Sequence, residues 1–213
     1  FNYSAINNFA VREAQGEYLL FLNNDVEIIT ENWLEEMLQL CQQKDVGMVG
    51  AKLYYPDDTI QHAGVVVGLG GVAAHVLCKL PRDAEGYMGR LRCVQEISAV
   101  TAACMMVKTS VFKAVGGFDE ELKVAFNDID LCMKVRKYGV KIVFTPYAEL
   151  YHYESKSRGM EDTPEKQLRF SREVNCFRRK WERELLKGDP YYNPNLTLNN
   201  TDCSLRKQEK NGD

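Results

Sequence analysis

The sequence contains no apolar stretch long enough to cross a bilayer. Its longest apolar runs, such as residues 94–107, are interrupted by polar residues and fall short of the roughly 20 residues that a spanning helix needs. A signal peptide is not visible, and neither a phosphate-binding P-loop nor a G-x-G-x-x-G fingerprint occurs. These absences argue against a spanning protein and against two common classes of nucleotide-binding protein.

Cysteine pairs of the C-x-x-C type are also absent, and the number of cysteines, seven, is odd. Most of them lie inside apolar stretches, as small buried hydrophobic residues do, which fits a reducing cytoplasm. The net charge is −3, and the basic residues are spread along the chain. We therefore expect no nucleic acid as a partner and no obligatory anionic membrane.

Alternating strand and helix patterns predict an α/β domain over residues 1–187. The apolar run 18–22 has the pattern of a strand covered on both faces, and it ends abruptly in polar residues. A helix capped by Thr30 and a strand over 45–53 follow, and the order strand, helix, strand implies parallel pairing. The polar composition from residue 188 to 213 predicts a tail or linker.

The remaining patterns predict further elements of the same kind, together with one glycine-rich turn. Residues 54–89 are less regular. The predicted elements are strands over 95–107 and 141–145, the second stopped by Pro146, helices from Thr109 and Asn127, and a last helix that Thr163 and Pro164 open.

Three polar clusters lie where predicted elements begin or end. They are Asn23-Asn24-Asp25 after a strand, Asn127 to Asp130 at a helix start, and Tyr151-His152 after a strand. Asp25 could hold Mg²⁺ or Mn²⁺ through a hard oxygen, with water and a diphosphate at the other coordination positions. A carboxylate at a helix start, such as Asp128, could serve as a general base. Together the clusters could supply what a metal-assisted transfer needs.

Each cluster also has a structural interpretation. An Asn-Asn-Asp sequence is ordinary turn chemistry, and Asn127 with Asp130 matches a helix-capping pair. A lone histidine such as His152 is more often structural than a ligand. For His62 and His75 we favour the structural interpretation. The residues alone leave these alternatives open.

The clusters occur in the order of a known family. The segments that carry the likeness are Asn8, Ala14–Asp25, Thr101–Cys104, Val115–Glu120, Phe126–Leu131 and Tyr151–Ser155. In this order they resemble the inverting family-two glycosyltransferases of the GT-A fold, especially bacterial enzymes that build rhamnose-containing and O-antigen polysaccharides. The resemblance covers about residues 1 to 160. It implies a mixed, mostly parallel sheet flanked by helices, from the carboxyl-terminal part of a catalytic domain that lacks its first strands.

The resemblance also implies a role for each site residue. Asp128 matches the general base, and Asp25 and His152 match ligands of Mn²⁺ or Mg²⁺. The matches to donor-binding positions are Asn8, Asn23, Asn24 and Arg158. The matches to positions on the acceptor side are Thr101, Ala102, Asp119 and Asn127.

The implied function is transfer of a hexosyl or rhamnosyl group, with inversion, in polysaccharide synthesis. The donor would be a dTDP- or UDP-linked sugar, and the acceptor a hydroxyl of a glycan or lipid-linked glycan. Such an enzyme would work in the cytoplasm, where it could lie peripherally at the inner face of the membrane. The exposed sheet edge could pair with a second copy. The alternative is a non-catalytic module of the same fold that binds a sugar or a partner enzyme, since Asn23 replaces the family's usual aspartate.

Overall fold

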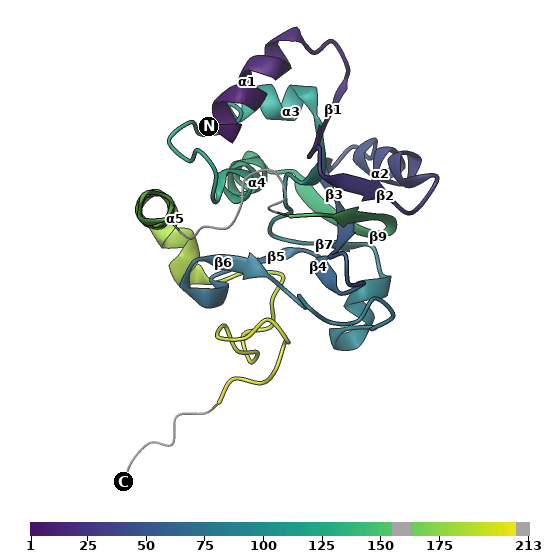
Figure 1. Ribbon diagram of the computed structural model, residues 1–213, viewed down its shortest axis with the longest axis vertical. Coiled ribbons are helices and arrows are strands. Elements are labelled where there is room, and N and C mark those ends of the chain that lie inside the picture. Colours follow the sequence, from purple (N-terminus) through teal and green to yellow (C-terminus); the bar gives the residue numbers. More distant parts are fainter. Residues whose placement is uncertain (155–162, 208–213) are drawn as a thin grey trace.

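The computed structural model describes residues 1–154 and 163–207, with one mixed β-sheet at its centre (Figure 1). Along the main path lie, in order, β1 (Tyr18–Leu22), β8 (Cys104–Lys108), β3 (Val46–Tyr54), β9 (Lys141–His152) and β2 (Val26–Ile28). Paired to these are β4 (Ile60–His62), on β3, and β7 (Gln95–Glu96), on β9. A separate two-stranded sheet joins β5 (Val65–Val67) to β6 (Ala73–His75).

The sheet is mixed, as predicted, but fewer of its pairings are parallel than we expected. β1 and β3 point in the same direction, as the order strand, helix, strand requires, yet β8 lies between them and is antiparallel to both. Among the strands of the described chain, only β3 and β9 pair in parallel. The insertion of β8 replaces one parallel pairing by two antiparallel ones, which is why a mostly parallel sheet was the wrong expectation.

Helices cover both faces of the sheet (Figure 1). They are α1 (Tyr3–Glu13), α2 (Trp33–Cys41), α3 (Thr109–Ala114), α4 (Asn127–Tyr138) and α5 (Pro164–Lys187), with short 3₁₀ turns at Leu69–Gly71 and Tyr87–Arg92. On one face, Trp33 of α2 joins a buried apolar cluster with Val49 of β3. On the other, Leu131 of α4 and Phe177 of α5 belong to a larger cluster. The predicted α/β class, a sheet flanked by helices, is confirmed.

Two helix starts differ in how well the sequence predicted them. α5 begins as expected, because the Thr163 side chain accepts a hydrogen bond from the backbone N–H of Lys166. α2 begins at Trp33, later than expected, and no side-chain cap closes its first turn. The hydroxyl of Thr30 instead accepts from the backbone N–H of Glu149 at 3.2 Å. The predicted capping residue therefore joins the helix start to β9.

Two predicted strands also differ from the observed ones. Residues 95–107 form not one strand but the short strands β7 and β8, with an irregular stretch between them. β9, in contrast, continues past Pro146 to His152. Its register with β3 shifts between Gly50 and Lys52, opposite the segment that contains Pro146. A proline is tolerated at such a bulge because the missing N–H removes no regular ladder bond.

Residues 188–207 are not the tail or linker that their composition predicts. Asp189 accepts hydrogen bonds from the backbone N–H of Val67 at 2.8 Å and from the Ser98 hydroxyl at 2.6 Å. Tyr192 and Leu196 are buried in the larger apolar cluster. The segment therefore packs on the domain, anchored by a few apolar side chains that a polar average composition concealed.

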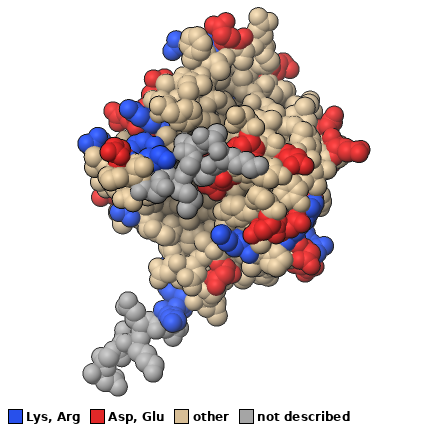
Figure 2. All heavy atoms as spheres, in the orientation of Figure 1, with Lys and Arg blue, Asp and Glu red and all other residues tan. Residues whose placement is uncertain are grey.

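The surface gives two further observations. On the face shown in Figure 2, acidic and basic side chains are interspersed. Within residues 1–154 and 163–207, no helix combines the length and the apolar character needed to cross a bilayer.

Candidate functional site

A cleft of about 730 Å³ opens beside the ends of β1 and β9. Its walls come from α1, the turn after β1, the segment before β8, the start of α4 and the end of β9. The sheet order brings these distant segments together, because β8 lies next to β1 and β2 lies next to β9. The predicted site residues that line this cleft are Asn23, Asn24, Asp25, Thr101, Ala102, Asn127, Asp128 and His152.

The turn after β1 and the end of β9 place Asp25 next to His152. Asp25 Oδ1 lies 3.2 Å from His152 Nε2, and both side chains are mostly buried. The register of β2 with β9, in which Val26 is paired with His152, fixes this approach. Among the described residues, no hydrogen-bond donor satisfies Asp25 Oδ1. Such an oxygen is rare in a folded protein, and an ion bound at the site is one accepted reason for it.

Gln61 on β4 determines which nitrogen of His152 faces Asp25. Gln61 Oε1 lies 2.7 Å from His152 Nδ1, and because an amide oxygen only accepts, Nδ1 carries the proton. The Gln61 amide also donates to the His152 carbonyl at 3.2 Å, which fixes its orientation. A neutral His152 therefore presents the lone pair of Nε2 to Asp25 and to the Asn23 amide, 3.1 Å away.

An imidazole lone pair beside a carboxylate oxygen without a donor suits a divalent cation such as Mn²⁺. The second-shell hydrogen bond from Gln61 is the arrangement that orients histidine ligands in metalloproteins. Within the part of the chain that the structure describes, no group of three or more His, Cys, Asp or Glu side chains gathers as a metal site. Asp25 and His152 are therefore the pair that could hold a cation here.

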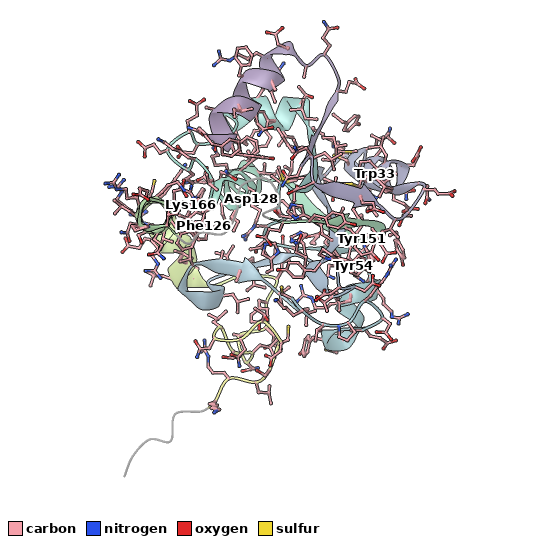
Figure 3. The ribbon with its side chains drawn as sticks, in the orientation of Figure 1. Trp33, Tyr54, Phe126, Asp128, Tyr151 and Lys166 are labelled. Carbon is pink, nitrogen blue, oxygen red and sulfur yellow. The ribbon has the colours of Figure 1, made fainter. Side chains whose placement is uncertain are left out.

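Asp128 enters the cleft from the first turn of α4 (Figure 3). Its Oδ2 accepts a hydrogen bond from the backbone N–H of Ala102 at 3.2 Å, and its Oδ1 accepts from that of Ile129 at 2.8 Å. Tyr3 lies nearby, with its hydroxyl donating to the Ala102 carbonyl. Burial, followed by the negative charge of Asp128, raises the pKa of Tyr3 well above its usual value. Asp128 is thus an oriented carboxylate at the positive end of a helix.

α5 holds the chain that leads into α4. The buried carboxylate of Glu173 accepts from the backbone N–H groups of Val124 and Ala125, each at 3.0 Å. Phe126, next in the chain, has a left-handed backbone with φ 62°, and its ring packs against Phe177 of α5. A non-glycine residue in this conformation needs such support. These contacts fix the position at which α4 begins and so the direction of its first side chains.

The alternative interpretation of Asn127 and Asp130 as a capping pair is wrong. Phe126 occupies the cap position, and no side-chain hydrogen bond caps this helix. Asn127 is the first helical residue and donates to the Val124 carbonyl at 3.1 Å. Asp130 is fully buried and accepts from the Trp181 indole N–H at 2.8 Å. Asp130 is therefore a core residue that joins α4 to α5, and Asp128 is left free to face the cleft.

Two described residues of the predicted site, Asn8 and Asp119, do not line the cleft. Asn8 of α1 is half-buried against the loop before α4, where its side chain accepts from the Phe118 N–H and donates to the Phe118 carbonyl, both at 2.9 Å. Asp119 pairs with Lys180 of α5 at 2.5 Å, which lowers the pKa of Asp119 despite the opposing effect of partial burial. Both positions shape the loop before α4 rather than the cleft. Arg158 lies outside the described residues.

Sequence reasoning missed Gln61 and assigned no site role to His62. Both lie on β4, which is only three residues long and whose place in the sheet depends on its pairing with β3. A short strand of this kind has no periodic signal of its own. The dipeptide Gln61-His62 between apolar residues was the available signal, because polar residues inside a buried run need partners.

A larger groove, of about 1060 Å³, lies on the other side of β9. Glu149 accepts hydrogen bonds from Tyr54 and from Arg82, which in turn contacts Asp58 at 3.4 Å. The hydroxyl of Tyr151 donates to Asp58 at 2.5 Å. Figure 3 shows Tyr54 and Tyr151 close together and apart from Asp128. We call Tyr54, Asp58, Arg82, Glu149 and Tyr151 the groove cluster. The charged groups of this cluster are paired with each other.

Comparison with known proteins finds a matching family model and two relatives that are longer than this chain. A family model described as a glycosyltransferase-like family matches residues 2–173. The chain is 57% identical over 206 residues to the uncharacterized protein y4gI of Sinorhizobium fredii, and 42% identical over 214 residues to the O-antigen biosynthesis protein RfbC of Myxococcus xanthus. These matches cover 96% and 100% of this chain, but only 23% and 16% of the relatives. The chain thus spans less than a quarter of either relative.

Two solved structures share the fold. The mannosyltransferase PcManGT from Pyrobaculum calidifontis, in complex with GDP-Man and Mn²⁺, aligns with a TM-score of 0.54 over 84% of this chain and 43% of that protein, at 16% identity. GalNAc-T7 with UDP, GalNAc and Mn²⁺ aligns with a TM-score of 0.61 over 87% of this chain and 36% of that protein, at 13% identity. At these identities the likeness concerns the fold alone, and the predicted GT-A architecture is confirmed.

Proposed function

The chain belongs to the glycosyltransferase-like family, and from that premise we propose that its cleft transfers a sugar from a nucleotide-diphospho-sugar to a hydroxyl acceptor. The observation that carries the proposal is the cleft itself. It contains the Asp25 oxygen without a donor beside His152, and Asp128 lines the same space. A cation site and an oriented carboxylate in one cleft are what a transfer to a hydroxyl group requires.

In this proposal Asp128 is the general base. A neutral hydroxyl is a weak nucleophile, and a carboxylate that withdraws its proton as the new bond forms lowers the barrier. Asp128 is held ready because the amides of Ala102 and Ile129 donate to its two oxygens. These bonds, with the helix start behind them, keep the carboxylate oriented toward the cleft.

Asp25 and His152 form the donor side. They would hold Mn²⁺ or Mg²⁺, which would supply positive charge where the departing nucleoside diphosphate becomes more negative. Asn23 and Asn24 line the same wall and offer amide groups to the donor. Thr101, Ala102 and Asn127 lie beside Asp128 and form the acceptor side. The placement of base and leaving group on different walls supports an in-line displacement with inversion.

The finer identity of the substrates rests on the relatives. One long relative is named for O-antigen biosynthesis. A segment of 62 residues is 36% identical to an N-acetylglucosaminyl-diphospho-decaprenol L-rhamnosyltransferase of Mycobacterium tuberculosis, a match over 29% of this chain and 20% of that protein. We therefore propose a hexosyl or rhamnosyl group on dTDP or UDP as the donor, and a glycan or lipid-linked glycan as the acceptor.

The test measures nucleoside diphosphate release by the whole polypeptide that contains this chain. UDP-glucose, dTDP-rhamnose and GDP-mannose are supplied in turn, with Mn²⁺ or with EDTA, to the wild type and to Asp128→Asn. We expect release that depends on Mn²⁺ and that falls by about 10² to 10⁴-fold in the variant. Equal release from both proteins would remove Asp128 as the base.

A further inference from the structure

His62 and His75 form a pair directly behind the cleft. His62 of β4 is fully buried, and its Nδ1 lies 3.0 Å from Nδ1 of His75 on β6, with the two ring planes at 81°. Nε2 of His62 faces the backbone N–H of Thr101 at 3.4 Å. Thr101 lines the cleft. The pair therefore contacts the cleft lining through the backbone of Thr101. The proposed mechanism gives the pair no role.

The hydrogen bonds determine where each ring carries its proton. The Thr101 N–H only donates, so Nε2 of His62 must accept, and a neutral His62 then carries its proton on Nδ1. That proton points to Nδ1 of His75, which must accept it, so the proton of His75 lies on Nε2. The opposite direction would leave His62 with no ring proton. Both rings are thus fixed in one tautomer as long as they are neutral.

The surroundings favour the neutral state. Burial, followed by the neighbouring His75 and His152, lowers the pKa of His62 well below its ordinary value of 6.5. Burial also lowers the pKa of His75, although the carboxylates of Asp128 and Glu154 act in the opposite direction. These are the ionisable groups that act on the pair. A proton added to either ring would set two N–H groups face to face or remove the acceptor of the Thr101 amide.

His62 and Asp128 accept hydrogen bonds from consecutive amides of one backbone segment. Thr101 donates to His62, and the next amide, that of Ala102, donates to Asp128 Oδ2 at 3.2 Å. Both residues lie between β7 and β8, where the amides of residues 100–103 are taken by side-chain acceptors. The two amides belong to adjacent peptide planes that meet at the Cα of Thr101, so their relative direction is set by the φ and ψ of this one residue. Because both planes are held by hydrogen bonds, a shift of the first plane displaces the second through this shared Cα.

We propose that His62, locked in one tautomer by His75, is a positioning residue that orients Asp128 through the consecutive amides of Thr101 and Ala102. The inference rests on the proposed function, because it takes Asp128 as the base. Loss of the acceptor on His62 would leave the Thr101 amide without its hydrogen bond. The Asp128 carboxylate would then lose its fixed orientation. Asp25 and His152 hold the donor side through other contacts, so donor binding should be spared.

The test compares two substitutions of His62 in the whole polypeptide. His62→Leu removes both hydrogen bonds, whereas His62→Gln supplies an amide oxygen for the Thr101 N–H and an amide N–H for His75. We expect His62→Leu to lower kcat by up to about 10²-fold, the effect of a misplaced catalytic group. KM for the nucleotide sugar and the Mn²⁺ concentration for half-maximal rate should stay unchanged. His62→Gln should recover most of kcat.

A second pair of variants covers the case in which His62→Leu does not fold. His75→Leu removes the acceptor that fixes the tautomer of His62, and His75→Gln restores one, at a side chain that is only partly buried. Here too we expect kcat to fall in the first variant and to recover in the second. Equal kcat for the Leu and Gln variants, or losses of kcat and donor affinity that run in parallel, would overturn the proposal.

The outcome also separates this inference from the function on which it rests. If Asp128→Asn abolishes turnover while all four histidine variants keep the wild-type kcat, the pair has no positioning role and the base assignment stands. If Asp128→Asn itself has no effect, the proposed function is the part that fails.

Discussion

Tyr151 and His152 are neighbours in β9, but they project to opposite sides of the sheet and join two different polar clusters. On one side, the groove cluster pairs the charges of Arg82, Asp58 and Glu149 with one another. On the other, His152 lies beside a carboxylate oxygen of Asp25 that has no donor among the described residues. The groove is the larger hollow, about 1060 Å³ against 730 Å³. The difference teaches that volume alone does not point to the proposed site, and that an unsatisfied carboxylate oxygen lining an open cleft does, whereas the similarly unsatisfied Asp130 Oδ2 is enclosed in the core.

Turnover should show the largest difference between the two regions. Asp128→Asn in the cleft should lower the rate of nucleoside diphosphate release by about 10² to 10⁴-fold, because it removes the base. Glu149→Gln is the same kind of substitution in the groove cluster, where it weakens the contact with Arg82. Its turnover, corrected for the folded fraction, should equal that of the wild type. A loss of turnover in Glu149→Gln as large as in Asp128→Asn would break the comparison.

Metal affinity should show the next largest effect. Gln61→Leu removes the acceptor of His152 Nδ1, so the ring can rotate or change tautomer. We expect Mn²⁺ to bind about 10 to 100-fold more weakly, as for other second-shell losses. Titration followed by the electron paramagnetic resonance signal of free Mn²⁺ measures this. Gln39→Leu, on the exposed side of α2, is the matched control, and equal affinities for both variants would contradict the role of Gln61.

A buried carboxylate away from the cleft should affect stability without affecting the site. Asp130→Leu leaves the Trp181 indole N–H without its acceptor, whereas Lys134 and Lys180 can turn toward solvent. The free energy of unfolding should fall by about 1–3 kcal/mol, measured with urea. The folded variant should keep its affinity for Mn²⁺. Unchanged stability would show that the buried network does not hold α5 to α4.

The smallest expected effect is the dependence of stability on pH. The pKa of His62 is lowered by burial, so the unfolded chain binds a proton near pH 6.5 that the folded chain does not bind. Stability from this group is therefore present above pH 6.5 and is lost as the pH falls toward the folded-state pKa, by at most about 1.4 kcal/mol per pH unit. The urea concentration at the midpoint of unfolding should differ more between pH 7.5 and pH 5.5 in the wild type than in His62→Gln. Identical shifts would contradict this.

The sequence predicted the cleft better than it predicted what supports the cleft. Asp25, Asp128 and His152 each stand at an element boundary, where a change from apolar to polar residues is visible locally. Gln61 and His62 have no such signal, because their role depends on the pairing of β4 with β3 and on side-chain contacts over long sequence separations, such as that of Gln61 with His152. Long-range pairing is the information that periodicity does not contain.

The same limit explains the other errors. Asn8 and Asp119 belong to motifs that resemble donor and acceptor positions, yet their side chains bind backbone and lysine outside the cleft. The packed segment 188–207 reads as a tail because a few buried side chains, such as Tyr192, carry its anchoring. In each case the tertiary partner of the residue, rather than its type, decided the outcome.

Calorimetric titration of Asp25→Asn and Asp128→Asn with Mn²⁺ and the nucleotide sugar tests the central claim most directly. The account predicts that Asp25→Asn loses binding, because the donor side is disrupted. Asp128→Asn should bind as the wild type does and yet fail to turn over. Two variants with the same binding, or an Asp128→Asn protein that cannot bind the donor, would contradict the division of one cleft into a donor side and a base.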